Sequence, residues 1–88
     1  MEPSSLDPRR KRIWFRCHHM GMHENDILLG GFVTKHILDL SEDQLDKLET
    51  LIAENDIDLL NWIIGRSEPP KEFDHDVLKM IQEFKKEV

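Results

Sequence analysis

Apolar residues recur every three or four positions along most of this chain, which is the spacing of a single buried helix face. One such stretch contains Leu45, Leu48, Leu51 and Ile52. No segment alternates apolar and polar residues with the two-residue period of a half-buried strand. The pattern therefore predicts an all-α fold, a compact bundle of about five short helices.

Residues that favour helix ends separate these stretches. Asp7 followed by Pro8 predicts a helix start, and Gly21 is expected to terminate that helix. Ser41 and Gln44 have the spacing of a capping box. Further helix ends are expected at His23 or Glu24, at Asp56, at Gly65 and at Asp74, with Phe73 as a hydrophobic staple against Leu78.

Gly30 and Gly31 fall in the middle of the second expected helix, where each glycine costs about 1 kcal/mol relative to alanine. The pair is expected to permit a close approach to another helix or a slight bend. A break into two short helices is the alternative. The apolar residues expected to face the core from this helix include Ile27, Leu28 and Phe32.

The length of the chain allows one hydrophobic core. For 88 residues we predict a single helical domain over residues 7–88, preceded by a disordered, polar N-terminus over residues 1–6. Such a small domain leaves little room for a catalytic pocket, which commonly encloses about 300–1,000 Å³. Size therefore favours a surface that binds a larger molecule.

Eighteen acidic residues against twelve basic ones give a formal net charge of −6, which disfavours binding to nucleic acid. The charges are unevenly distributed, since acids predominate from Glu24 to Asp58. The molecule is therefore expected to have an acidic flank and a basic end. The basic residues cluster at Arg9, Arg10, Lys11, Arg12 and Arg16.

The single cysteine, Cys17, excludes an internal disulfide and fits a reducing compartment. No apolar stretch approaches the ~20 residues of a membrane-spanning helix. The N-terminus also has no signal-peptide hydrophobic core. A soluble cytoplasmic protein with no membrane partner is expected.

The turn from Met20 to Asp26 has two interpretations. In the simpler one, Gly21 is a C-cap, and Glu24 and Asp26 are first-turn acids favoured by the helix dipole. In the functional one, the same carboxylates and free backbone N–H groups form an exposed corner that a partner protein recognises.

A wider pattern favours the functional interpretation. The pattern contains, in order along the chain, Phe15-Arg16, Met20-Gly21, Glu24, Asp26-Ile27-Leu28-Leu29-x-x-Phe32, the capping-box helix and Asp56-x-Asp58-Leu59-x-Asn61-Trp62-Ile63. This pattern resembles the FAD assembly factor family, small proteins that promote covalent flavin attachment to the flavoprotein subunit of succinate dehydrogenase. The resemblance covers the chain from about Arg9 to Phe84.

The resemblance implies a chaperone-like assembly factor rather than an enzyme, with no catalytic residues of its own. Its expected partner is the flavoprotein subunit of succinate dehydrogenase or fumarate reductase. The FAD is then held by that partner, and this chain binds no cofactor stably. A monomer is expected when the protein is free.

The hallmark of the family is Arg-Gly-x-x-Glu, and this chain has Met20 in place of the arginine. Either a nearby cation (His19, His23 or Arg16) fills the role of the guanidinium, or the partner is bound more weakly. The predicted partner-binding residues are Arg16, Gly21, Met22, His23, Glu24 and Asp26.

Other interpretations are less favoured. Cys17, His18, His19 and His23 are residue types that bind zinc, but Gly21 interrupts their helical spacing, so no metal site is expected. A Cys–His catalytic pair lacks an orienting group. The main alternative is a small helical regulatory or nucleic-acid-binding protein, antitoxin-like, acting through the basic first helix.

Overall fold

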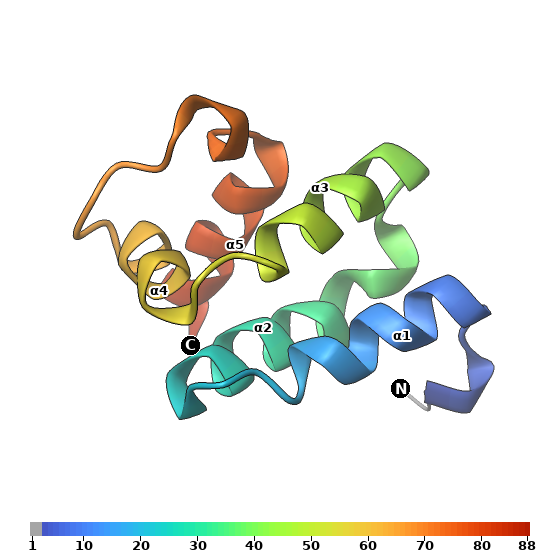
Figure 1. Ribbon diagram of the computed structural model, residues 1–88. Coiled ribbons are helices and arrows are strands. Elements are labelled where there is room, and N and C mark those ends of the chain that lie inside the picture. Colours follow the sequence, from blue (N-terminus) through green and yellow to red (C-terminus); the bar gives the residue numbers. More distant parts are fainter. Residues whose placement is uncertain (1–2) are drawn as a thin grey trace.

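The computed structural model describes residues 3–88, and over these residues the fold is all-α, as predicted. The α-helices pack into one body with principal extents of 36 × 26 × 23 Å (Figure 1). They are α1 (Pro8–Cys17), α2 (His23–His36), α3 (Glu42–Ile52), α4 (Asp56–Ile64) and α5 (Asp76–Glu87). Short 3₁₀ segments are η1 (Pro3–Ser5), η2 (Ile37–Asp39) and η3 (Lys71–Phe73).

The C-terminal helix α5 packs against α2, α3 and α4, whereas α1 packs against α2 and α3. One apolar core lies between them, because each helix contributes its periodic apolar face. Fully buried core residues include Leu29, Phe32, Ile37, Leu45, Leu48, Leu51, Leu59 and Ile81. Trp62 belongs to this core and stacks on Phe73.

Helix α2 runs without a break through its two glycines, which confirms the close-approach interpretation. A Cβ atom on Gly30 would lie 3.0 Å from the His18 ring, and one on Gly31 would lie 2.9 Å from the Phe84 ring. The expected core role of Ile27 is wrong, since its side chain is 56% exposed.

The N-caps of α1 and α3 match their predictions. Asp7 accepts a hydrogen bond from the Arg10 N–H at 2.9 Å, and Ser41 and Gln44 form both bonds of the capping box. Gly65 ends α4 with a left-handed backbone at φ 82°, also as expected.

Two other N-caps lie one residue away from their predicted positions. Asn55, not Asp56, caps α4 by accepting from the N–H groups of Ile57 and Asp58. His75, not Asp74, caps α5 by accepting from the Leu78 N–H. In each case two adjacent polar side chains compete for the same role, and the backbone geometry selects one.

The predicted termination of α1 at Gly21 is wrong. The helix ends at Cys17, and His18 follows with a right-handed helical backbone. Among the described residues Gly65 alone has a positive φ, so Gly21 is not a left-handed C-cap. Gly21 therefore needs another explanation, which its neighbours supply below.

The N-terminus is more ordered than expected where it is described. Pro3–Ser5 form a 3₁₀ turn, and Leu6 is buried in the core at 7% exposure. Residues 1 and 2, part of the segment predicted to be disordered, lie outside the described residues. The extent of the single domain over residues 7–88 stays a prediction.

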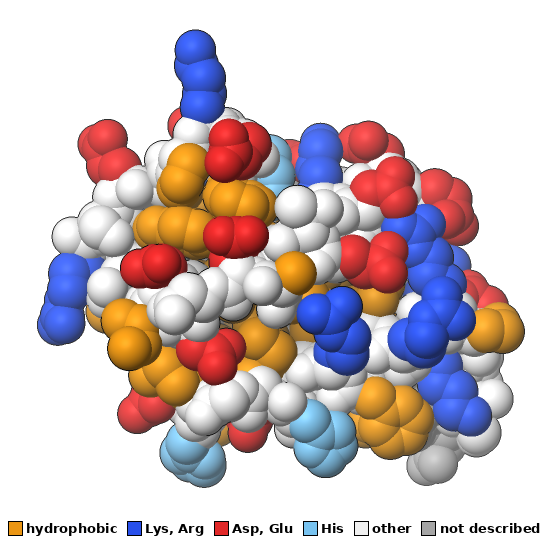
Figure 2. All heavy atoms as spheres, in the orientation of Figure 1, with side chains coloured by type: hydrophobic (Ala, Val, Ile, Leu, Met, Phe, Trp, Pro, Cys, Tyr) orange, Lys and Arg blue, Asp and Glu red, His pale blue; other side chains and the backbone are white. Residues whose placement is uncertain are grey.

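The acidic flank and the basic end face the same side of the molecule. Figure 2 shows acidic side chains gathered over α3 and Lys and Arg side chains over the adjacent α1. No helix within residues 3–88 is both long enough and apolar enough to span a bilayer.

Candidate partner-binding site

The two sequence blocks that carry the family pattern meet in space. The Asn25 side-chain amide donates a hydrogen bond to the Asp56 carbonyl oxygen at 3.0 Å. A Cβ atom placed on Gly21 would overlap the Asp56 carboxylate. Residues 20–26, called the elbow from here on, therefore rest on the N-terminal end of α4 (Figure 1).

Gly21 thus provides space for a neighbouring side chain within the same molecule. Its backbone conformation is ordinary, so the requirement for glycine is steric rather than conformational. The sequence predicted Gly21 as a partner-binding residue, and that role stays a prediction. The Asp56 carboxylate already fills the space that a side chain at position 21 would occupy.

Glu24 is the free anionic group of the elbow. Its side chain is exposed, and it forms no hydrogen bond or ion pair with any residue in the range 3–88. Because Glu24 is exposed and has no partner among these residues, its carboxylate is available to bind a second protein. The exposed His23 and half-buried Met22 lie next to it along the chain.

Asp26, by contrast, forms hydrogen bonds within the elbow. Its carboxylate accepts a hydrogen bond from the Met20 N–H, while its own N–H donates to the Met22 carbonyl at 3.0 Å. These bonds close the turn that presents Glu24. Asp26 therefore positions the elbow, and its carboxylate is only partly available to a partner.

The first turn of α2 contributes donors beside Glu24. Met22 occupies the N-cap position and has no side-chain oxygen, so no N-cap side chain binds the first N–H groups of α2. Uncapped N–H groups carry partial positive charge. The elbow therefore offers a carboxylate acceptor and backbone donors side by side.

Met20, which replaces the motif arginine, is half-buried and packs against the core. The cations proposed to replace that arginine are His19, His23 and Arg16. None of them forms an ion pair with Glu24 in the part of the chain that the structure describes. Arg16 instead lines an open groove along α1 with Lys11, Arg12 and Phe15.

Cys17 and His18, which precede the elbow, are held by contacts within the fold. Cys17 is fully buried, and burial raises the pKa of its thiol to about 12. The His18 ring stacks on Trp14 with centroids 3.7 Å apart, and its Nδ1 lies 2.7 Å from the Trp14 carbonyl oxygen. Residues 3–88 bring together no group of three potential metal ligands.

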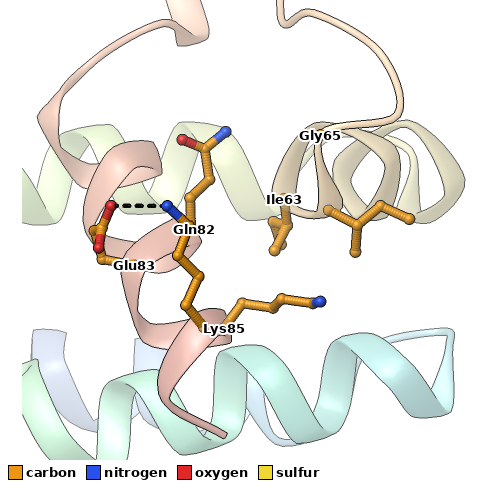
Figure 3. A pocket seen from close by; sticks show the side chains of 7 residues that line it. Ile63, Gly65, Gln82, Glu83 and Lys85 are labelled. Carbon is orange, nitrogen blue, oxygen red and sulfur yellow. Dashed lines mark hydrogen bonds and ion pairs between the residues drawn. The ribbon is translucent and has the colours of Figure 1, made fainter.

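The groove between α4 and α5 is remote from the elbow. It encloses about 250 Å³ and is lined by Ile63, Gly65, Gln82 and lysines of α5 (Figure 3). It lies at the C-terminal end of α4, whereas the elbow contacts the N-terminal end of the same helix. None of the residues that line this groove belongs to the elbow.

Asn25 and Asp56 are the residues of this site that the sequence did not identify. Asn25 is fully buried, the sole polar residue in the described core. Asp56 was interpreted as a helix cap. Only the juxtaposition of the two sequence blocks in the fold reveals that both support the elbow.

One protein-family model matches most of this chain. A family model described as "flavinator of succinate dehydrogenase" matches residues 11–85 of this chain. The chain belongs to this family. The match spans α1 through most of α5 and includes the elbow and the α4 residues beneath it.

Relatives within the family carry consistent names. Succinate dehydrogenase assembly factor 2 of Dictyostelium discoideum is 41% identical over 81 residues, covering 92% of this chain and 57% of the relative. Assembly factor 2-B of Drosophila melanogaster is 32% identical over 83 residues, covering 92% and 53%. The chain thus spans little more than half the length of these relatives.

The names of these relatives place them in mitochondria, which contradicts the cytoplasmic location expected from the sequence. The expectation rested on a single cysteine, on the lack of a long apolar stretch and on the absence of a signal-peptide hydrophobic core. None of these features distinguishes the cytoplasm from another reducing compartment.

Proposed function

We propose that this chain is an assembly factor that binds the flavoprotein subunit of succinate dehydrogenase and promotes covalent attachment of FAD to it. Membership of the flavinator family and the names of the relatives support this proposal. The observation that carries it is the exposed, unpaired Glu24 on an elbow braced by internal bonds.

In this proposal the chain acts by binding and supplies no catalytic group. The bond to the flavin forms within the partner, between its own side chain and the FAD it holds. This chain accelerates the step only if it binds the reactive conformation of the flavoprotein more tightly than the others. A fumarate reductase flavoprotein is the second candidate partner.

The bracing of the elbow suits such a role. A binding group held by the surrounding structure loses less conformational freedom on association than a mobile one. The Asp26 bond to Met20 closes the turn, and the Asn25 bond to Asp56 fixes it to α4. Glu24 therefore projects from a preorganised support toward cations or N–H donors of the partner.

Coexpression with a succinate dehydrogenase flavoprotein subunit tests the proposal. Covalent flavin is read as acid-stable fluorescence of the flavoprotein band on a denaturing gel. We expect the wild-type chain to increase this signal and Glu24→Ala to reduce the gain about tenfold or more, since a charge-assisted hydrogen bond contributes about 1.5–3 kcal/mol.

Glu68→Ala is the matched control, because Glu68 is also exposed and unpaired within the described residues but lies in the connector before η3. It should leave the flavin signal unchanged. An equal signal with and without the wild-type chain would refute the proposed function. Equal losses for the two variants would refute the role of Glu24.

A further inference from the structure

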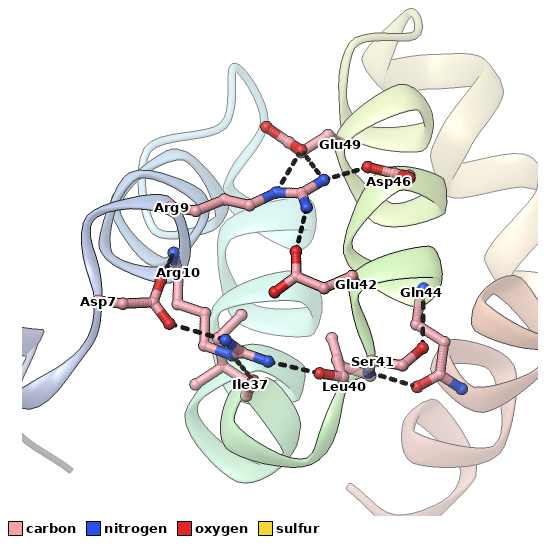
Figure 4. A network of polar contacts seen from close by, with 10 residues as sticks. All are labelled: Asp7, Arg9, Arg10, Ile37, Leu40, Ser41, Glu42, Gln44, Asp46 and Glu49. Atoms are coloured by element: carbon pink, nitrogen blue, oxygen red, sulfur yellow. Dashed lines mark hydrogen bonds and ion pairs between the residues drawn. The ribbon is translucent and has the colours of Figure 1, made fainter.

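The five cations near the N-terminus divide into two groups. Arg9 and Arg10 are bound within the molecule (Figure 4). Arg9 donates to Glu42, Asp46 and Glu49 of α3. Arg10 donates to Asp7 and to the carbonyl oxygens of Ile37 and Leu40, at 2.9 and 2.6 Å.

The other three cations remain free. Lys11, Arg12 and Arg16 are exposed and form no ion pair or hydrogen bond through their side chains with residues 3–88. Arg12 and Arg16 are four positions apart on α1, a spacing at which like charges repel. The fold pairs Arg9 with carboxylates of α3 and Arg10 with Asp7 and backbone carbonyls. It leaves the positive charge of Lys11, Arg12 and Arg16 unbalanced on the solvent-exposed side of α1.

An apolar side chain lies among the free cations. Phe15 is 43% exposed, and its ring meets the edge of Trp14 with centroids 5.2 Å apart. An open groove of about 500 Å³ runs along this side of α1. It is lined by Pro8, Lys11, Arg12, Phe15 and Arg16, which we call the basic face.

Charge and shape restrict what can occupy the basic face. Three unpaired cations around an exposed phenylalanine fit an acidic polypeptide segment that places an apolar side chain between its carboxylates. A nucleic acid fits less well, because α1 is only about 15 Å long and a duplex would extend over the acidic side chains of α3 (Figure 2).

We propose that the basic face binds an acidic segment of the same flavoprotein subunit that the elbow engages. This inference rests on the proposed function, from which it takes the partner. Only residues 18 and 19 separate the end of α1 from the elbow, so one partner can contact both surfaces. The basic face then accelerates and orients association, while Glu24 acts after docking.

Association kinetics test this division of roles. The chain is mixed with the flavoprotein subunit at about 50 mM and about 300 mM salt, and the association rate constant is measured. The test variant neutralises three cations of the basic face, as Lys11→Gln, Arg12→Gln and Arg16→Gln together. The control removes three equally exposed, unpaired cations elsewhere, as Arg66→Gln, Lys71→Gln and Lys85→Gln together.

We expect the test variant to associate about tenfold or more slowly at low salt, with a weakened salt dependence, because steering depends on local charge. The control should stay within about twofold of the wild type, although its net charge is the same as that of the test variant. Circular dichroism verifies that both variants remain helical.

Three outcomes would overturn the inference. One is an unchanged association rate in the test variant. Another is an equal loss in test and control, which would indicate net charge rather than the basic face. The third is salt-sensitive binding of a short DNA duplex that the test variant loses while flavoprotein association is unaffected. Failure of the wild-type chain to bind the flavoprotein refutes the proposed function itself, and so separates the two failures.

Discussion

Gly21 shows how a single missing side chain shapes the elbow. Its φ is not positive, and the space beside its Cα is filled by the Asp56 carboxylate. We expect Gly21→Ala to lower the free energy of unfolding by up to about 1 kcal/mol, because the new methyl group displaces the Asp56 carboxylate from the first turn of α4, where the helix dipole favours an acid. Chemical denaturation of the variant and the wild type measures the difference.

Asp56→Ala provides the control for that prediction. In a double-mutant cycle, the cost of Gly21→Ala should largely disappear once the Asp56 carboxylate is removed. Gly65→Ala should cost about 1 kcal/mol for a different reason, its left-handed φ of 82°, and should not couple to Asp56. Additive costs for Gly21→Ala and Asp56→Ala would contradict the steric explanation.

For single residues, the sequence predicted the exposure of a side chain better than its hydrogen-bond partners within the fold. The exposure of Glu24 followed from its place in a helix first turn, and the structure agrees. Asp26 occupies the same turn, yet its carboxylate is bound to the Met20 N–H. Sequence spacing cannot reveal that bond, because it depends on the path of the chain between α1 and α2.

A histidine cap makes the start of helix α5 sensitive to pH. Nδ1 of His75 accepts from the Leu78 N–H at 3.2 Å, which requires a neutral ring. Burial is the largest cause that lowers the pKa of His75 below its ordinary value of 6.5, and Lys47 adds to it against the opposing charges of Asp76 and Asp74.

The sign of the effect follows from proton binding. Because the unfolded chain takes up the His75 proton at higher pH than the folded chain, the stabilising contribution is complete above pH 6.5 and is lost as the pH falls below it. We expect His75→Asn, which keeps an acceptor at the cap, to flatten the decline of unfolding free energy below pH 6.5.

Denaturation at several pH values measures that slope, and one proton limits the difference to about 1.4 kcal/mol per pH unit. The exposed His23 provides the control, since His23→Asn removes a histidine that caps no helix. Identical slopes for the wild type and His75→Asn would show that the cap does not titrate in this range.

The helix ends indicate where prediction from sequence succeeds and where it fails. Asp7 and Ser41 were assigned correctly because each is the sole capping residue next to its helix. Asn55 and His75 were missed because an aspartate stands beside each of them. Local chemistry locates a helix start to within a residue, and tertiary packing selects the cap.

At the scale of the whole molecule, the apolar pattern was sufficient for the all-α fold but not for the arrangement of charges. The sequence suggested a basic end separate from an acidic flank. In the structure Arg9 of α1 reaches Glu42 and Glu49 of α3, so the two regions form one contact (Figure 4). Such a contact depends on which helices become neighbours, which no periodicity specifies.

This contact predicts how charge supports the packing of α1 on α3. Hydrogen bonds to Glu49 and Asp46 raise the pKa of the Arg9 guanidinium above its ordinary value, so the cation persists at all accessible pH values. Arg9→Gln leaves the α3 carboxylates facing one another without a counter-charge. We expect a lower Tm than the wild type at low salt.

Lys11→Gln is the matched control, because it removes the same charge from the same helix at an exposed position without an ion pair among residues 3–88. Its Tm should stay near that of the wild type. At about 1 M salt, where the Debye length is about 3 Å, the difference between the two variants should shrink as carboxylate repulsion is screened. Equal Tm values at low salt would mean that the bonds from Arg9 to the carboxylates of α3 contribute nothing to stability. Apolar packing would then be sufficient to hold α1 against α3.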